Sequence, residues 1–557
     1  MKRHLPALFV LFCAVIVATW PLASVLGTAA IGHPYGDMPD HYWGTWWFGK
    51  ELLSGTIPLH TDLSHYPETL SLWYIDPIGA LLALPLRVFG FPAAWNLLLL
   101  IQVSATALAG YFIGHDVSGQ RSSGVVAGVV AGLSPYMLGL LHSGLAECIS
   151  LAPVTLYVWL LLRASGLDPR GRPAPKHAGA WSAVLLALSG AASLYYFLFG
   201  LIFAGAAIPG PGWRERGRAL LPIAIGGSVL AAPVALLTLS TLGDGGAVTT
   251  ANAPGWISRL PATDILTFIR PGTYYFPDTP AGGNPGILHI NYLGWAALGL
   301  AGLGIWRAAS RWRLTTPGAV YGVFMLGPRL AFAQHLVMIA GTSVLLPLGL
   351  FCFPGSPLGF VHQPYRMVAF FMPWLAIAAA LGASHLRATL RPALVVCVLA
   401  ETLFVSPAHW PLVNRVMTPP ATHLALSAGP VLDWPPDGST ANRDYLMWAT
   451  QHGQPVPYGV NVFLSEKLRR DPLINAMLRL LRRLDMRSRN RDVPFQGRLL
   501  LTPTGTETQL AAMGFVHVIV HKESLDNREW TGTESLLHEA FGAPIEEDTK
   551  DAVWAVR

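Results

Sequence analysis

The chain has 557 residues, of which 52% are hydrophobic and 12% are charged. Soluble proteins carry about 25% charged residues, so this composition excludes a large globular enzyme and indicates an integral membrane protein. The formal net charge of +6 does not indicate a nucleic-acid partner, because the arginines lie in short loops between apolar runs, as they do in membrane proteins.

Apolar runs long enough to cross about 30 Å of hydrocarbon follow one another along most of the chain. With 180–208 counted as a helical hairpin, they predict about eleven transmembrane helices, at 6–27, 92–114, 122–141, 145–163, 180–208, 219–241, 289–306, 317–334, 364–386 and 392–408. The shorter run 75–91 is interrupted by Pro77, Pro85 and Arg87. We expect it to form a half-span or a re-entrant segment, which leaves the exact number of spans open.

Basic residues predict the orientation of these spans, because cytoplasmic loops carry an excess of lysine and arginine. The basic segments, which we expect to face the cytoplasm, are 2–3, 121, 163–176, 214–218, 307–313 and 387–391. If 75–91 does not cross the membrane, the parity of the spans places the first loop (28–75) and everything beyond 409 on the outer face. The N-terminus is then cytoplasmic.

Residues 409–557 have the composition of a soluble domain. Val516–His521 alternates like a strand, Glu507–Met513 and Glu534–Phe541 have helical patterns, and Val553–Val556 is expected to be a closing strand. The predicted fold is therefore an α-helical polytopic membrane domain (1–408) followed by a small extracytoplasmic α/β domain (409–557).

The first external loop is rich in carboxylates, imidazoles and aromatic rings for so apolar a protein. Asp37 and Asp40 are followed by His41 and Tyr42, and Glu68 comes later in the same loop. A carboxylate can act as a general base or can stabilise a developing cation. Aromatic faces stack on sugar rings. The pattern is typical of a carbohydrate-processing site.

A structural interpretation of the same loop stays open. Asp37 fits the cap of a helix that begins near Pro39, with Asp40 in the first turn of that helix. Glu68 in Tyr-Pro-Glu and Asp76 in Asp-Pro fit ordinary turn chemistry. For Asp37 the two interpretations are compatible, because a capped helix is a rigid mount for a catalytic carboxylate.

A second polar group lies farther along the chain, between two apolar spans. His142 and Glu147 stand close to hydrocarbon, where ionisable groups are costly and are candidates for function. The alternative is a plain loop capped by Ser143. Arg366 stands at the entrance of the next-to-last span, where a guanidinium suits a phosphate group. The alternative for Arg366 is snorkelling toward lipid headgroups.

Two kinds of site have no signature in the sequence. No Gly-rich phosphate loop lies between a strand and a helix, which argues against nucleotide hydrolysis. No Cys/His spacing is of the zinc type. No metal ligand is therefore predicted and no cofactor is certain, although the scattered histidines leave a divalent metal open.

These motifs give the chain a resemblance to the GT-C class of integral-membrane glycosyltransferases. That class includes protein mannosyltransferases and aminoarabinose transferases, and related bacterial multi-spanning proteins resemble the chain more closely. The matching motifs are Gly36-Asp37-x-x-Asp40-His41-Tyr42, His65-Tyr66-Pro67-Glu68, His142-x-Gly144-x-x-Glu147, Gln363-Pro364-x-Arg366 and Met513–His521. In that class a first-loop aspartate acts on the acceptor or aids departure of polyprenyl phosphate. The chain lacks the Asp-Glu dipeptide of the best-known members, so the resemblance implies this role for Asp37 or Asp40.

The resemblance implies a glycosyltransferase of the bacterial inner membrane. It would move a sugar from a polyprenyl-phosphate donor to an envelope lipid, glycan or protein acceptor on the outer face. Asp37, with Asp40 in reserve, would activate the acceptor and Arg366 would hold the donor phosphate. The remaining expected substrate-binding residues are His41, Tyr42, Glu68, His142 and Glu147. The expected partners are this donor and membrane lipid, without nucleic acid, and no partner protein is predicted. A non-catalytic scaffold for envelope polysaccharide assembly and a lipid-linked sugar transporter remain alternatives.

Overall fold

The computed structural model describes residues 2–34, 36–71, 76–243, 263–272, 288–351, 364–416, 419–424, 428–436, 441–459, 464–481 and 505–556. The chain forms two compact units. Unit 1 comprises residues 1–38, 75–236 and 254–415, and unit 2 comprises residues 39–74, 237–253 and 416–557. Most of the first loop therefore belongs to the same unit as the C-terminal region.

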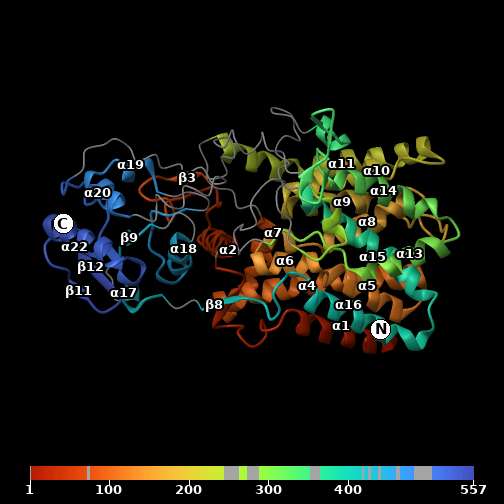
Figure 1. Cartoon of the computed structure of the whole chain (residues 1–557), viewed down its shortest axis with the longest axis horizontal. Helices are drawn as coiled ribbons and strands as arrows, with labels where there is room; N and C mark the ends of the chain where they lie inside the picture. Colours follow the sequence, from red (N-terminus) through yellow and green to blue (C-terminus); the bar gives the residue numbers. More distant parts are fainter. Residues whose placement is uncertain are drawn as a thin grey trace. The chain divides into compact units, whose positions relative to one another are not determined.

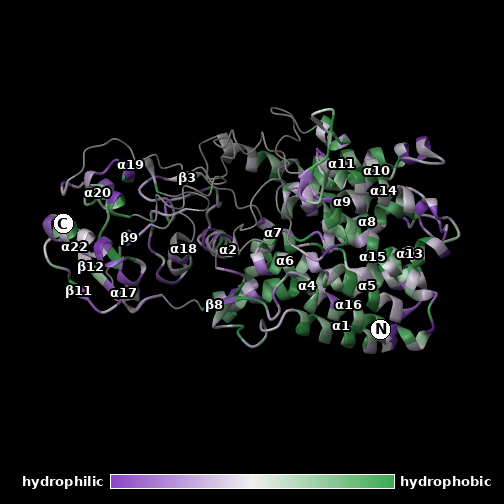
Figure 2. Cartoon of the chain, viewed as in Figure 1, coloured by the Kyte–Doolittle hydropathy of each residue, from purple (hydrophilic) through white to green (hydrophobic). Residues whose placement is uncertain are grey.

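Unit 1 is a bundle of helices, most of them apolar (Figures 1 and 2). Its helices are α1 (Leu5–Ala18), α3 (Pro77–Ala83), α4 (Phe91–Ser118), α5 (Arg121–Gly132), α6 (Pro135–Ser143), α7 (Ala146–Ile149), α8 (Ala152–Ala164), α9 (Ala178–Ala192), α10 (Leu194–Ala206), α11 (Trp213–Gly243, whose end passes into unit 2), α13 (Trp295–Arg307), α14 (Trp312–Met325), α15 (Val368–Ser384) and α16 (Arg391–Phe404). The short strand β1 (Ala29–Ile31) pairs with β8 (Asn414–Val416).

Five helical stretches among the described residues are long and apolar enough to cross a membrane. They are Phe91–Ser118, Arg121–Ser143, Ala146–Ala164, Trp213–Thr238 and Pro364–Ser384. The chain is therefore a membrane protein, as its composition predicts. The total of about eleven spans stays a prediction.

The centre of unit 1 is the stretch Arg121–Ser143, whose apolar window is entirely buried. Within it, α5 packs against α4, α15 and α16. Small residues allow the close approach of α4 and α5: a Cβ atom added at Gly132 would lie 2.6 Å from the Cα atom of Ala107. Membrane helices commonly pack through small residues in this way. The predicted polar residue His142 lies near the end of this buried stretch.

Two of the less regular apolar segments do not form single long helices. The predicted hairpin at 180–208 is confirmed: α9 and α10 pack against each other and are separated by Ser193. Residues 76–89 form the short helix α3 and the 3-10 helix η2 (Pro85–Phe89) instead of one long helix. At 1.5 Å per residue α3 is about 10 Å long, too short to cross a bilayer.

The predicted span 317–334 is wrong in its second half. Helix α14 ends at Met325, and Gly327 follows with a φ of 83°, directly before a proline. The chain then forms two short hairpins, β4 (Ala331–Phe332) with β5 (His335–Leu336), and β6 (Met338–Ile339) with β7 (Thr342–Ser343). Ala333 and Gln334 both have positive φ, as a two-residue hairpin turn requires. Apolarity alone did not distinguish these strands from a helix.

Unit 2 combines helices with a four-stranded mixed sheet. Its elements are α2 (Met38–Leu53, in unit 2 from Pro39), β2 (His60–Thr61), β3 (Leu70–Ser71), α17 (Ala421–Leu424), β9 (Val431–Trp434), α18 (Ala441–His452), α19 (Glu466–Arg469), α20 (Pro472–Leu480), β10 (His517–His521), α22 (Asn527–Phe541), β11 (Glu546–Glu547) and β12 (Asp551–Ala555). The sheet order is β11-β12-β10-β9, in which β10 is parallel to β9 and antiparallel to β12. Val431, Ile519 and Val553 form its buried core.

Several elements predicted for the C-terminal region are confirmed. β10 and β12 match the predicted strands, and α22 contains the predicted helix at 534–541. The helix predicted at Glu507–Met513 is wrong, because this segment is irregular and ends in a turn. Its backbone is held by a side chain instead: the carboxylate of Asp471 accepts a hydrogen bond from the Gln509 N–H at 2.7 Å.

Candidate functional site

A buried ion pair joins two predicted site residues of unit 1. Arg366 lies in the 3-10 helix η6 (Pro364–Met367) and Glu147 lies in α7. The Nη1 atom of Arg366 is 3.3 Å from the Oε1 atom of Glu147, and their side chains are only 9% and 3% exposed. Because the guanidinium is paired inside the protein, snorkelling toward headgroups does not describe Arg366.

Aromatic residues surround this pair. The Nε atom of Arg366 donates to the Tyr365 hydroxyl at 3.3 Å, and its guanidinium lies 5.4 Å from the centre of the Tyr195 ring. The Cys148 thiol donates to Glu147 at 3.3 Å. The tyrosines and the adjacent thiol hold the buried charges in fixed positions without adding another full charge.

Asp37 is linked to the same group of side chains. It lies immediately before α2 and is half-buried, and its backbone N–H donates to the Ser143 carbonyl at 3.0 Å. Its carboxylate acts electrostatically on His289 and Tyr365, whose rings are 4.4 Å apart between centroids. Since Arg366 also acts on His289, unit 1 brings Asp37 and the ion pair into one polar group.

His142 is buried beside two other histidines. Its ring centroid lies 5.0 Å from that of His33 and 5.3 Å from that of His409. The His33 N–H donates to the His142 carbonyl at 2.6 Å, which ties the first loop to the end of α6. Sequence reasoning missed His289, Tyr365 and His409. The available signal was the position of Tyr365 between Pro364 and Arg366 in a motif already noted.

Asp76 has an environment that the sequence did not indicate. It caps α3 by accepting a hydrogen bond from the Gly79 N–H at 2.8 Å, in agreement with the predicted turn role. However, it is almost completely buried. Burial raises the pKa of Asp76 to about 8, with a further increase from the nearby Glu147 carboxylate and an opposing effect of the Gly79 hydrogen bond. Asp76 is thus mostly protonated at neutral pH.

We expect Asp76→Asn to stabilise the protein increasingly as the pH rises. Asparagine keeps the cap and stays neutral, whereas the unfolded wild-type chain releases the Asp76 proton near its ordinary pKa of 3.8 and the folded chain releases it near 8. The wild type therefore loses stability between about pH 4 and pH 8, and the variant does not. The measurement is the thermal midpoint in detergent across this range. The exposed Asp62→Asn is the control, and a constant difference between Asp76→Asn and wild type would contradict the assignment.

The other predicted site residues lie in unit 2. Helix α2 begins at Met38, as the Asp-Met-Pro sequence predicts, and Asp40 is in its first turn. Asp40, His41 and Tyr42 are buried, and burial raises the pKa of Tyr42. Unit 1 thus contains Asp37 with the Arg366–Glu147 pair, while unit 2 contains Asp40 and its neighbours. The catalytic and substrate-binding roles stay predictions.

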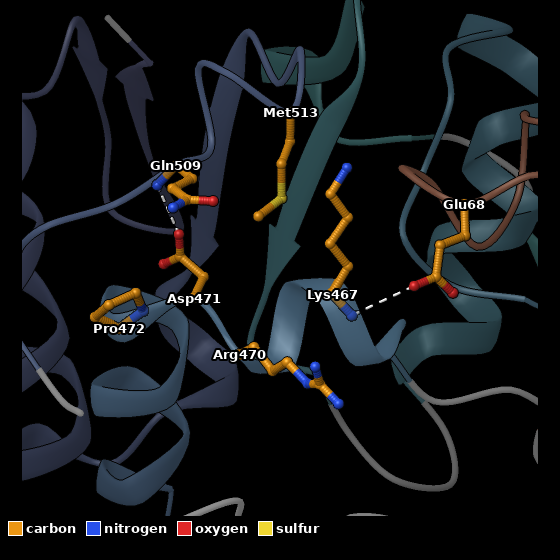
Figure 3. Close-up of a pocket in the computed structure, with 7 residues that line it drawn as sticks. All are labelled: Glu68, Lys467, Arg470, Asp471, Pro472, Gln509 and Met513. Carbon is orange, nitrogen blue, oxygen red and sulfur yellow. Dashed lines mark hydrogen bonds between the residues drawn. The ribbon is translucent and has the colours of Figure 1, made fainter. Parts of the chain in front are cut away.

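Glu68 borders a pocket of about 470 Å³ in unit 2 (Figure 3). Its Oε1 atom accepts from the Lys467 backbone N–H at 3.3 Å, and its Oε2 atom is 3.2 Å from the Nε2 atom of His65. The pocket is lined by Glu68, Lys467, Arg470, Asp471, Pro472, Gln509 and Met513. Its volume falls in the range of small-molecule sites, and its mixed charges suit a polar ligand.

Comparison with known proteins gives similarity at the level of structure. No family model matches the sequence, and no curated protein is similar to it in sequence. The arabinofuranosyltransferase AftD from mycobacteria has a TM-score of 0.50 and 15% identity, over 100% of this chain and 41% of AftD. The oligosaccharyltransferase AglB from Archaeoglobus fulgidus, in complex with an inhibitory peptide and a dolichol-phosphate, has a TM-score of 0.47 and 11% identity, over 96% of this chain and 71% of AglB.

A third similar structure is ArnT from Cupriavidus metallidurans bound to undecaprenyl phosphate. It has a TM-score of 0.44 and 12% identity, over 98% of this chain and 97% of ArnT. At these sequence identities the similarity concerns the fold alone. It rests on the AftD structure, whose TM-score is 0.50. This chain spans 41% of the length of AftD. The predicted resemblance to GT-C membrane glycosyltransferases is confirmed at the level of the fold.

Proposed function

We propose that this chain is a membrane glycosyltransferase that uses a polyprenyl-phosphate sugar as donor. The acceptor is a lipid, glycan or protein of the cell envelope, on the outer face of the inner membrane. The observation that carries the proposal is the buried Arg366–Glu147 pair and its link to Asp37 through His289 and Tyr365. The fold shared with an arabinofuranosyltransferase supports the same class of reaction.

The proposed reaction is an inverting displacement at the anomeric carbon. Asp37 accepts the proton of the acceptor hydroxyl while the hydroxyl oxygen forms a bond to that carbon. The bond between the carbon and the phosphate oxygen breaks, and polyprenyl phosphate leaves with the bonding electrons. Arg366 holds the phosphate, since a guanidinium fork matches phosphate oxygens. Asp40 is the reserve candidate for the base, and His142 and Glu147 line the site.

The proposed architecture places this chemistry outside the cytoplasm. It has about eleven spans, a membrane domain at 1–408 and an extracytoplasmic α/β domain at 409–557. His41, Tyr42 and Glu68 of unit 2 are further proposed substrate-binding residues. The pocket beside Glu68 in unit 2, with exposed Lys467 and Arg470, suits a ligand that carries polar groups.

We expect topology reporters to confirm this orientation. A reporter inserted at 168–176 or at 209–218 should be cytoplasmic, because both segments belong to the basic loops. A reporter fused after Arg557 should be outside. Fusions to a fluorescent protein report a cytoplasmic location, and fusions to alkaline phosphatase report a location outside the cytoplasm. A cytoplasmic C-terminus would contradict the external site, because the assignment of the first loop depends on the same parity.

The proposed function is tested by transfer of radiolabelled sugar in membrane vesicles that contain the overexpressed chain. A panel of polyprenyl-phosphate sugars is supplied, and label is followed into the lipid, glycan and protein fractions. Label should appear in one fraction above the level of vesicles without the chain. Donor binding without transfer would favour the scaffold, and movement of intact donor between leaflets would favour the transporter.

A further inference from the structure

Three side chains of unit 2 that have no role in the proposed reaction converge at one end of its sheet. The Nε2 atom of His423 lies 2.6 Å from the Oδ1 atom of Asp433, and the Nε2 atom of His521 lies 3.1 Å from the same oxygen. All three side chains are buried. One ligand-type atom of each lies within 4.8 Å of the others. This spacing is compatible with a shared cation.

The register of the sheet explains why these residues meet. Ile519 pairs with Asp433 across the parallel strands, and His521 pairs with Asp551 across the antiparallel strands. Because side chains alternate along a strand, Asp433, His521 and Asp551 share one face. Asp433 and His521 lie near the carboxyl ends of the parallel pair β9 and β10, and α17 supplies His423. Such carboxyl ends are where open α/β sheets commonly bind ligands.

A second carboxylate orients one of the histidines. The Nδ1 atom of His521 is 2.8 Å from the Oδ1 atom of Asp551, which accepts the Nδ1–H hydrogen bond. The Nε2 atom then points toward Asp433. Metal-binding histidines typically donate their other ring N–H to a carboxylate in this manner, which fixes the tautomer and the ring orientation.

The charges of the cluster also favour a cation. In the described part of the chain, the ion-pair partners of Asp433 and Asp551 are His423 and His521. Buried carboxylates are costly without a compensating charge. The rings of His423 and His521 are stacked at 5.7 Å with an interplanar angle of 3°, so both rings border the same space. One divalent cation held between these rings and Asp433 would compensate both carboxylates.

One carboxylate oxygen of the cluster is also available as a ligand. The Oδ2 atom of Asp433 is buried and has no hydrogen-bond partner among the described residues. His452, which stacks on His423, is not a ligand: its Nδ1 atom accepts from the Gln454 N–H at 3.0 Å, so its proton is on Nε2. The ligand set is therefore two imidazoles and one carboxylate.

We propose that His423, Asp433 and His521 bind a divalent transition-metal ion, with Asp551 positioning His521. Imidazole nitrogen and carboxylate oxygen suit Zn²⁺, whose bonds of about 2.0–2.2 Å separate tetrahedral ligand atoms by roughly 3.3–3.5 Å. The observed separations of 2.6 and 3.1 Å require an opening of less than about 1 Å. The ion would fasten α17 to β9 and β10.

Metal content tests this proposal directly. The full-length protein in detergent is treated with a chelator, dialysed against Zn²⁺ and measured by mass spectrometry of the metal. The wild type should retain about one Zn²⁺ per chain, as expected for one three-ligand site. His423→Gln and His521→Gln should retain almost none. The control His538→Gln, which removes an exposed histidine of α22, should retain the wild-type amount.

Asp551→Asn separates a metal site from a hydrogen-bonded cluster, and it decides the question if the histidine variants do not fold. This change keeps the ligand atoms but weakens the orientation of His521, so we expect a Zn²⁺ affinity about 10–100-fold lower. In the wild type, Zn²⁺ should raise the thermal midpoint, and Co²⁺ should give the visible absorption of a tetrahedral site. Wild-type protein without bound Zn²⁺, or an unchanged Zn²⁺ affinity in Asp551→Asn, would overturn the proposal.

Discussion

Replacing Asp37 with asparagine is expected to lower sugar transfer by about 10²–10⁴-fold, the usual effect of losing a general base. The fold should persist, because the hydrogen bond from Asp37 to Ser143 uses the backbone N–H and not the carboxylate. Asparagine is also a good residue at the start of a helix. The measurement is the initial rate of transfer from a polyprenyl-phosphate donor at matched protein levels.

Two matched variants make this result interpretable. Asp62→Asn removes an exposed carboxylate of the first loop and should leave the rate unchanged. Asp40→Asn removes a buried carboxylate in the first turn of α2, where the helix dipole stabilises it by about 0.3–1 kcal/mol, so we expect a modest loss of stability. If Asp40→Asn were inactive while Asp37→Asn kept its activity, Asp40 and not Asp37 would be the general base. Full activity in both would refute the carboxylate mechanism.

Breaking the buried ion pair is expected to have the second large effect. Arg366→Met removes the positive charge that pairs with the buried Glu147 carboxylate, which should cost about 3–5 kcal/mol of folding free energy. The double variant Arg366→Met/Glu147→Gln removes both charges and should recover most of that stability. Sugar transfer should be lost in both, because neither retains the cation proposed to hold the donor phosphate.

This combination separates stability from donor binding. Arg218→Met, which removes an exposed arginine of α11, is the control for losing a positive charge. Stability is measured as the thermal midpoint in detergent, and donor binding as retention of a labelled polyprenyl-phosphate sugar. If the double variant regained full transfer together with stability, Arg366 would be purely structural.

Local patterns predicted the parts of the fold that depend on neighbouring residues. The start of α2 follows from an aspartate before Pro39, and the α9–α10 hairpin follows from an apolar run too long for one span. The strand β10 follows from the alternation at 516–521. In each case the deciding interactions lie within a few residues of one another.

The errors arose where local patterns have more than one solution. The apolar run 317–334 fits a helix by composition, yet Gly327 with its following proline ends the helix, and the residues after it pair as hairpins. The segment 507–513 has helical residue types, but Asp471, a distant residue, binds its backbone instead. Tertiary contacts of this kind override local propensity.

The sequence predicted several residues of the candidate site but not how they contact one another. Glu147 was chosen because ionisable groups near hydrocarbon are costly, and Arg366 because a guanidinium suits a phosphate group. The structure pairs the two. His289 was missed, because nothing local connects it to Asp37. The cluster of His423, Asp433 and His521 is formed by the register of the sheet, and their spacing in the sequence has no resemblance to a metal motif.

The most direct test of the proposed transferase is the stoichiometry of donor cleavage. Purified wild-type protein in lipid nanodiscs is given a polyprenyl-phosphate sugar and the acceptor fraction identified in vesicles. Released polyprenyl phosphate and transferred sugar are then measured together. We predict that they appear in equal amounts, and that Asp37→Asn binds donor without releasing polyprenyl phosphate. Wild-type protein that binds donor but never cleaves it would contradict the proposal that this chain is a glycosyltransferase.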